Sequence, residues 1–258
     1  MIRIMRPPAS AKAIAALSAG TAKVAKMAAS ILADPANAGK YGATFKFDSA
    51  IYGHTDVKQE LIALQHGKCA YCEGKILAFS SGDTEHYRPK GYSKQGAKTK
   101  PIRPGYYWLA FEWSNLHFAC EKCNRAHKGN VFPLRDPASR ARSPADDLSL
   151  EDPMLLDPSG PREPADHMRF KGAVPEARTD VGRDTIEYYW LDRIPLTDLR
   201  LEHLEKVDAL KKLVKLAAEP GAGANAIKYG AEAEAQLARM VLPNAVFTAM
   251  TRDYLNPN

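Results

Sequence analysis

The chain has 258 residues, of which 45% are hydrophobic and 26% are charged. This is the composition of an ordinary globular protein, and it excludes collagen-like, coiled-coil and wholly disordered chains. The 36 Lys and Arg against 30 Asp and Glu give a formal net charge of +6, which favours polyanionic partners. No apolar run reaches the roughly 18 residues of a membrane span, and Lys12, Lys23 and Lys26 interrupt the early apolar residues before they resemble a signal peptide. We therefore expect a cytoplasmic protein that makes no contact with a membrane.

The N-terminal part of the chain is predicted to be mainly helical. Ser10 is a suitable N-cap for a helix over residues 10–32, whose apolar side chains recur at helical spacing and which an Asp-Pro pair ends. Residues 41–52 contain aromatic side chains that favour a short strand. A second helix is expected to begin at Thr55 or Asp56 and to end at the next glycine.

The middle of the chain differs from both ends. Residues 69–134 are rich in glycine and aromatic side chains, which predicts small strands and loops that lead into a short helix. The segment over residues 86–142 contains twelve Lys and Arg but only three Asp and Glu, a net charge of +9, so the rest of the chain sums to −3. A polyanionic partner would therefore meet this middle segment.

The C-terminal part begins with a connection rich in Pro, Asp and Ser over residues 135–164, and structure is expected to resume near Arg169. Three helices are predicted beyond it, over residues 183–191, 196–218 and 224–240. The apolar residues of the second helix predict one apolar face and one charged face. The chain as a whole is therefore predicted to be an α+β protein.

The four cysteines form two close pairs, Cys69-Ala-Tyr-Cys72 and Cys120-Glu-Lys-Cys123, separated by 47 residues. Four thiolates complete the tetrahedral shell of a structural zinc ion. Two alternatives stay open, namely unrelated buried cysteines and a redox-active thiol pair, and a redox protein would hold no tight zinc. Because the two pairs use every cysteine of the chain, the pattern favours zinc. The long spacing suggests that functional residues lie between the pairs.

The residues between and after the cysteine pairs occur in a specific order. Glu85 and His86 begin the sequence EHYRPK, Asn115 lies in WSNL, and Asn124 follows the second pair directly. This order resembles the HNH endonucleases, whose small ββα-metal fold pins a two-stranded hairpin to a helix with four zinc-bound cysteines. The resemblance covers residues 69–134, about a quarter of the chain.

A closer resemblance is to the HNH proteins of Septu-type antiphage defence systems and of some retrons. The sequences CAYCE, EHYRPK, WSNL and CEKCNRAHKGNVFPL match that group, and LLDP, DHMRF and DTIEYYWLDR extend a weaker likeness towards the C-terminus. The resemblance implies an HNH core over residues 67–135, between an N-terminal helical region (residues 1–66) and a mainly helical C-terminal extension (residues 136–258). It also implies that the chain is a DNA-cutting effector of a prokaryotic defence system that works with an ATPase partner. The terminal helices could dock such a partner or simply pack on the core.

Cleavage of a phosphodiester bond needs a base, a metal ion and cations that hold the strand. His86 has the pKa range of a base at neutral pH, and Glu85 offers a hard oxygen ligand for Mg²⁺ or Mn²⁺. Because adjacent strand residues point to opposite faces, a strand end or a bulge is expected at this pair. By resemblance, Asn115 orients the base and Asn124 is the second ligand of the catalytic ion.

Asn124 departs from the three-letter HNH pattern, in which many relatives have a histidine at this position. An amide oxygen favours Mg²⁺ or Mn²⁺ over Zn²⁺ or Ni²⁺ as the catalytic ion. His127, three residues on, is a possible substitute ligand, but it suits a surface position near phosphate better. Four basic residues are expected to contact phosphates irrespective of base sequence, namely Arg88, Lys90, Arg125 and Lys128.

A second hypothesis is a zinc-stapled nucleic-acid-binding module that has lost catalysis. The zinc site and the basic middle segment are all that it requires. The presence of Glu85, His86, Asn115 and Asn124 together counts against it, because binding alone needs none of them.

Overall fold

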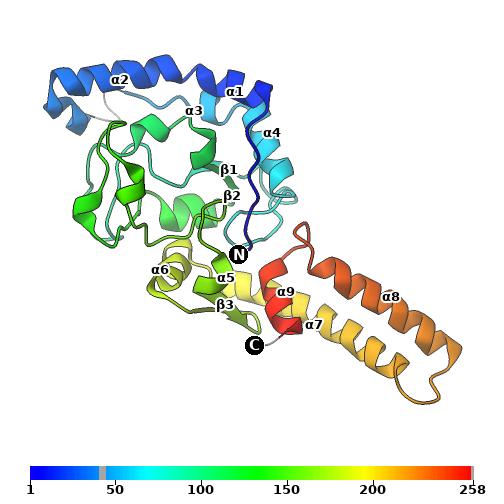
Figure 1. The fold of residues 1–258 in the computed structure, drawn as a ribbon. Helices are drawn as coiled ribbons and strands as arrows, with labels where there is room; N and C mark the ends of the chain where they lie inside the picture. The colour runs from blue at the N-terminus through cyan, green and yellow to red at the C-terminus, as the bar shows by residue number, and fades with distance from the viewer. Residues whose placement is uncertain (41–44, 257–258) are drawn as a thin grey trace.

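The computed structural model describes residues 1–40 and 45–256, and Figure 1 shows how their helices and two small sheets are arranged. The α-helices are α1 (Ala11–Ser18), α2 (Thr21–Ala33), α3 (Ser49–Tyr52), α4 (Thr55–Leu64), α5 (Pro164–His167), α6 (Asp180–Tyr189), α7 (Ile194–Ala217), α8 (Ala224–Met240) and α9 (Thr248–Leu255). The strands are β1 (Asp83–His86), β2 (Leu116–Ala119), β3 (Met168–Lys171) and β4 (Val174–Ala177). Short 3-10 turns η1 (Pro35–Lys40), η2 (Tyr107–Leu109), η3 (Trp113–Asn115), η5 (Pro137–Ser139) and η6 (Leu148–Leu150) and the π-helix η4 (Lys122–Lys128) complete the elements. The α+β prediction is confirmed.

The predicted first helix is in fact two helices. Ser10 caps α1 as predicted, since its hydroxyl oxygen accepts a hydrogen bond from the Ala13 amide at 3.3 Å. The chain then breaks before α2 at Gly20, where a Cβ atom would lie only 2.2 Å from the ring of Phe111. The periodicity of the sequence could not reveal this tertiary contact, and the prediction of one continuous helix was wrong.

The predicted strand over residues 41–52 falls partly on residues 41–44, which lie outside the described part of the chain. The last residues of that stretch form α3 instead, because the Asp48 carboxylate caps a helical turn through the Ala50 amide at 3.0 Å. The next helix, α4, begins at Thr55 as predicted, although its cap is the ring of His54. Gly67 takes a left-handed conformation with φ of 71° and ends the segment.

The strands β1 and β2 form an antiparallel pair in the middle of the molecule, with Glu85 opposite His117 and His86 opposite Leu116. The π-helix η4 follows β2 almost directly in the chain. Hydrogen bonds from Asn124 and Lys128 of η4 to Asp83 and His86 hold it against β1. The side chain of Gln65 completes the other edge of β2, because its amide nitrogen donates to the Phe118 carbonyl at 2.7 Å and its oxygen accepts from the Phe118 amide at 2.8 Å. A side-chain amide thus replaces a neighbouring strand.

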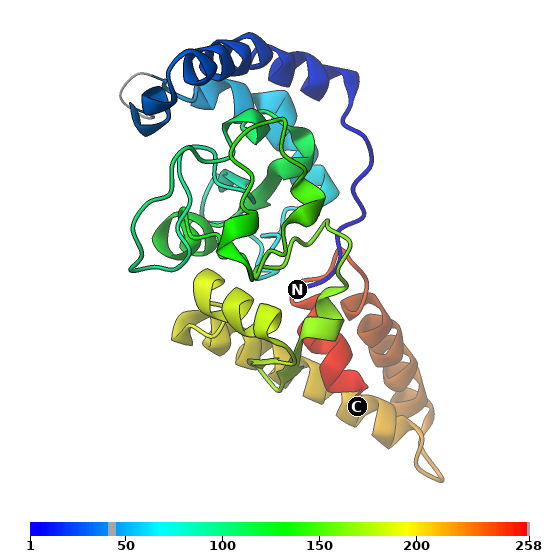
Figure 2. The same ribbon diagram turned by 60° about the vertical axis from the view of Figure 1, so that its left-hand side comes forward.

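The C-terminal part consists of the small β3–β4 sheet, α6, α9 and a long hairpin of α7 and α8 that extends away from the rest of the molecule (Figures 1 and 2). The predicted apolar face of α7 is only partly buried. Leu196, Leu204 and Val207 are buried, but Leu199 is 54% and Leu216 is 51% exposed. Exposed apolar side chains therefore occur near both ends of α7, and the helix has its most extensive packing against α8.

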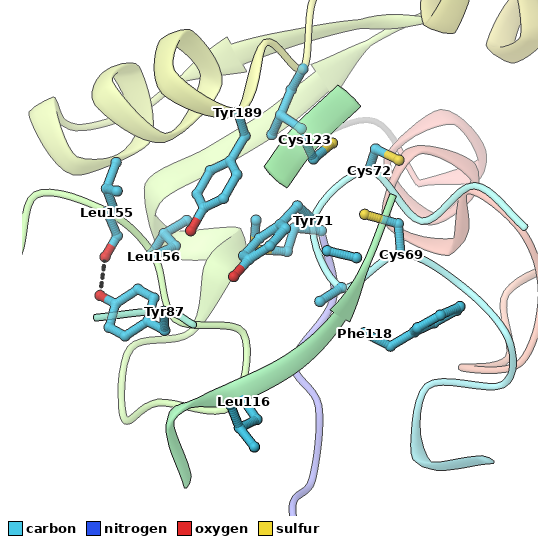
Figure 3. Packing of buried hydrophobic residues seen from close by; sticks show 14 of the residues in the cluster. Cys69, Tyr71, Cys72, Tyr87, Leu116, Phe118, Cys123, Leu155, Leu156 and Tyr189 are labelled. Carbon is cyan, nitrogen blue, oxygen red and sulfur yellow. Dashed lines mark hydrogen bonds between the residues drawn. The ribbon is translucent and has the colours of Figure 1, made fainter. Parts of the chain in front are cut away.

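One hydrophobic core joins residues from all three predicted segments. At its centre the ring of Tyr71 stacks on that of Tyr189 from α6, with 3.8 Å between centroids (Figure 3). Nearby, the Tyr87 hydroxyl donates to the Leu155 carbonyl at 2.6 Å. Among the helices of residues 1–40 and 45–256, none is long and apolar enough to cross a membrane.

We expect Gln65→Met to lower the free energy of unfolding by about 1–3 kcal/mol, because the buried Phe118 amide loses its acceptor, whereas the Phe118 carbonyl keeps the bond from the Ala70 amide. Urea unfolding followed by circular dichroism measures this change. The matched control is Gln236→Met on the exposed surface of α8, which should change stability by less than about 0.5 kcal/mol. Equal effects of the two substitutions would show that Gln65 does not support β2.

Candidate active site and metal centre

The four cysteines lie together at one end of the β1–β2 pair. Their sulfur atoms are all within 4.8 Å of one another, and the sulfur atoms of Cys72 and Cys120 are 3.9 Å apart. Tetrahedral zinc with Zn–S bonds of about 2.3 Å separates its sulfur ligands by roughly 3.8 Å, so the donor set fits one zinc ion. Hydrogen bonds from the other three cysteines hold the pKa of Cys72 well below its ordinary value, whereas burial raises the pKa of Cys69 well above it. A zinc ion bound to the four sulfur atoms would favour the thiolate of each of them.

The fold brings the two cysteine pairs together through β2. The first pair follows α4 and is tied to β2 by a hydrogen bond of 3.0 Å from the Ala70 amide to the Phe118 carbonyl. The second pair begins where β2 ends and leads into η4. The 47 residues between the two pairs contain β1, the loop over residues 87–115 and β2, and β2 returns the chain to the first pair.

Arg193, directly before α7, contacts the cysteine cluster. Its two terminal nitrogen atoms lie 3.6 Å from the sulfur of Cys123 and 3.9 Å from that of Cys120. Burial opposes the charge of this guanidinium, but the nearby thiolates outweigh it and raise the pKa of Arg193. A zinc ion with four thiolates carries two negative charges, and Arg193 compensates part of them. Sequence reasoning missed this residue, because it lies 70 positions beyond Cys123 and outside any motif.

A polar cavity of about 560 Å³ lies next to β1 and η4. It is lined by residues of α3, α4, β1, η4 and the loops beside them: Ser49, Tyr52, Gly53, Lys58, Gly82, Asp83, Thr84, Glu85, His86, Pro89, Lys90, Asn124, Arg125, Gly129 and Asn130. The structure thus brings three of the four predicted catalytic residues to one cavity. The fourth, Asn115, lies behind it.

His86 is the last residue of β1, at the strand end that was expected, and it is 4% exposed. Its Nε2 lies 2.9 Å from the Ala110 carbonyl oxygen, which can only accept, so this nitrogen carries the proton. Nδ1 is then the basic atom, and the Lys90 ammonium donates to it at 3.2 Å. Burial and the Lys90 charge lower the pKa of His86 well below its ordinary value, so the ring is neutral at neutral pH.

Asn115 connects the residues that follow His86 to the start of β2. Its amide oxygen accepts from the Arg88 amide at 2.7 Å, and its amide nitrogen donates to the carbonyls of Arg88 at 3.0 Å and Leu109 at 3.1 Å. All the hydrogen bonds of this buried side chain therefore go to the backbone of the loop that carries His86.

Glu85 and Asn124 both line the cavity, on the side of η4. One oxygen of Glu85 contacts the Lys128 ammonium, which also donates to the His86 carbonyl at 2.8 Å. The amide nitrogen of Asn124 donates to an oxygen of Asp83 at 3.1 Å. Among the described residues, neither Glu85 Oε2 nor Asn124 Oδ1 accepts a hydrogen bond, so each side chain has one oxygen without a protein partner.

The four basic residues predicted to contact phosphates lie in different surroundings. Lys128 is fully buried against Glu85, a position that does not suit a phosphate contact. Arg88 pairs with the buried Glu151 at 3.0 Å and does not line the cavity. Lys90 and Arg125 do line it, and the side chain of Arg125 is 64% exposed. Burial lowers the pKa of Lys90 to about 8.

His127 does not reach the cavity. Its ring packs on that of Trp190 with 3.8 Å between centroids, on the far side of η4. Burial and the nearby charge of Arg193 lower its pKa. This packing suits neither a metal ligand nor a phosphate contact.

Among the cavity residues that sequence reasoning missed, three contact the site through polar or aromatic groups, namely Tyr52, Lys58 and Asp83. The ring of Tyr52 meets that of His86 edge-on at 4.7 Å, and the Lys58 ammonium donates to the Gly82 carbonyl at 2.8 Å. Asp83 could have been found, because a residue two positions before Glu85 on a strand lies on the same face. Tyr52 and Lys58 come from helices that no motif connects to this site.

The fold and the site define an α+β protein with a four-cysteine cluster that can bind zinc, beside a cavity lined by a carboxylate, an imidazole and cationic groups. The chain is similar to the Septu protein PtuB of Bacillus mycoides (strain KBAB4), with 36% identity over 171 residues. This similarity covers 65% of the chain, and the chain spans 57% of that protein's length. No family model matches the chain, and no solved structure is significantly similar to it.

We expect the purified protein to contain one zinc ion per chain by elemental analysis, and Arg193→Gln to release that zinc to a chelating dye about tenfold faster, because a charged group that contacts the thiolates is lost. Arg183→Gln on the exposed surface of α6 is the matched control and should release zinc at the wild-type rate. Zinc-free, fully folded wild-type protein would contradict the zinc assignment and favour a redox role for the cysteines.

Proposed function

We propose that the chain is a metal-dependent HNH-type endonuclease that hydrolyses phosphodiester bonds of DNA, with its catalytic core over residues 67–135. The observation that carries the proposal is the setting of His86. Its Nε2 proton is held by a backbone carbonyl, which leaves Nδ1 as a neutral base inside a cavity that also contains a carboxylate.

In the proposed reaction, Nδ1 of His86 removes a proton from the attacking water. The imidazole stays in place because the Ala110 carbonyl binds Nε2 and the Tyr52 ring packs against its edge. Asn115 fixes the backbone of Arg88 and so the loop behind the base. The Lys90 ammonium, now on Nδ1, can transfer its hydrogen bond to a phosphate oxygen when the strand enters.

The catalytic divalent ion of this proposal is Mg²⁺ or Mn²⁺, held by Glu85 and Asn124. Their two unengaged oxygens are the hard donors that these ions prefer, and a bound ion would neutralise charge on the phosphate. The buried Lys128 holds the other oxygen of Glu85 and thereby fixes the direction of this carboxylate. Lys90 and Arg125 are the proposed phosphate contacts.

We further propose that this nuclease acts in antiphage defence, together with an ATPase partner. The support is the similarity to a Septu protein and the motifs that resemble Septu-type HNH proteins. The basic middle segment favours a nucleic-acid substrate less strongly than its net charge suggests. Several of its cations are already paired inside the protein, as Arg88 is with Glu151 and Arg140 is with the Tyr106 hydroxyl at 2.8 Å.

We expect the zinc-loaded protein to cut plasmid DNA with Mg²⁺ or Mn²⁺, and His86→Ala to lower the rate by at least about 100-fold, because the general base is removed. Gel electrophoresis of the plasmid measures the rate, and the zinc content is checked after every chelator treatment. The matched control is His127→Ala, which lies outside the cavity and should cut at the wild-type rate.

The outcomes separate the competing functions. DNA binding without cutting, unchanged by metal and by His86→Ala, would favour the inactive binding module. If the isolated chain does not cut, the assay is repeated with a candidate ATPase partner. Cutting that appears with the ATPase and needs His86 supports the nuclease, whereas its absence there too contradicts it.

A further inference from the structure

Asp83 is the first residue of β1, and it lies on the same face of the strand as Glu85. Its side chain is 17% exposed and lines the cavity together with Glu85, His86 and Asn124. The roles proposed above use each of these residues except Asp83. Its side-chain hydrogen bonds, however, all go to Asn124 and Arg125, which both have a role in the proposal.

The carboxylate of Asp83 accepts three hydrogen bonds from the start of η4. Oδ2 accepts from Asn124 Nδ2 at 3.1 Å and from Arg125 Nε at 2.9 Å, and Oδ1 accepts from Arg125 Nη2 at 2.9 Å. An ionised carboxylate can only accept, so the amide of Asn124 must turn its nitrogen towards Asp83. The amide oxygen is then the unengaged end of a side chain that lines the cavity.

The orientation of this amide decides whether Asn124 can bind a cation. Its two ends have nearly the same shape, but the oxygen attracts a divalent ion and the NH₂ group repels it. Without a partner that only accepts, both orientations would be populated. The same carboxylate also holds the guanidinium of Arg125 in a two-bond pair at the rim of the cavity, although that side chain is 64% exposed.

We infer that Asp83 is a positioning residue, which directs the amide oxygen of Asn124 towards the divalent ion and holds Arg125 where the strand enters. This inference rests on the proposed function, because it gives Asn124 and Arg125 the roles stated there. It assigns to Asp83 no contact with the metal or the substrate.

Binding of Mn²⁺ to the zinc-loaded protein, measured from the free-ion signal in electron paramagnetic resonance, tests the inference without any assay of cutting. Asp83→Ala should weaken Mn²⁺ binding about tenfold, the effect typical of removing a partner that orients a metal ligand. Arg125→Gln keeps the bond between Asp83 and Asn124, so it should change Mn²⁺ binding less than about twofold but raise the KM for DNA. Glu121→Gln, an exposed carboxylate beside η4, controls for the loss of one negative charge.

A double-mutant cycle with Asn124→Asp separates positioning from the other roles of a carboxylate. Both ends of Asp at position 124 are oxygens, so there is no orientation left to fix. In that background, Asp83→Ala should not weaken Mn²⁺ binding, because no orientation is lost and a like-charged neighbour of the new carboxylate is removed. An equal loss in both backgrounds would mean that Asp83 acts through its charge or binds the ion itself, and it would overturn the inference. So would a loss in Arg125→Gln as large as that in Asp83→Ala.

Two further results make the test decisive. Wild-type protein that binds no Mn²⁺, or a Glu85→Gln variant that binds it normally, would overturn the proposed metal site and the inference with it. If Glu85→Gln loses Mn²⁺ and Asp83→Ala does not, the inference alone fails. Zinc content and thermal unfolding check that each variant is folded, and Asp83→Ser, whose shorter side chain cannot reach η4, replaces Asp83→Ala if needed.

Discussion

The convergence of the four thiols is the constraint on which the site depends. The two cysteine pairs are separated by 47 residues, and this separation is closed only where the end of β2 meets the turn after α4. Closing it fixes the start of η4 relative to β1, and so it sets which side chains of the two elements face each other. Hydrogen bonds between β1 and β2 then determine the register that places Glu85 opposite His117. A two-stranded sheet this short is not stable alone. The four-cysteine cluster, the Gln65 amide and the surrounding helices must therefore stabilise it.

Local patterns in the sequence predicted the parts of the fold that depend on local interactions. The Ser10 cap and the helix over residues 224–240 follow from capping and propensity. The end of β1 at His86 was expected for another reason, namely that two adjacent strand residues can serve one site only where the strand ends or bends. The break at Gly20 could not be predicted, because it depends on a ring that lies 91 positions away in the sequence. The same is true of α7, whose apolar residues fit a buried face but which packs mainly against α8 and leaves Leu213 and Leu216 partly exposed.

The candidate site was predictable to a similar degree. The order of the motifs along the chain is enough to group His86, Glu85 and Asn124, and all three line one cavity. The ion pairs were not predictable, because the sequence does not show which Lys or Arg side chains of the middle segment are buried against a carboxylate. Lys128 is buried and Arg125 is exposed, although they lie three residues apart on the same helix. Which cation meets solvent depends on which carboxylate lies across from it, and only the fold decides this.

The buried contact between Lys128 and Glu85 couples the substitutions that these two positions can tolerate. A neutral residue at either position would leave the other charge buried without a counter-ion, which typically costs about 3–5 kcal/mol of stability. A chain that changes one of them must therefore change the other as well or lose its fold. Sequences related to this one should show the two positions altering together, as an acid with a base or as two neutral residues. A pair of neutral residues at these positions would indicate a chain that keeps the fold but lacks the carboxylate of Glu85 in the cavity.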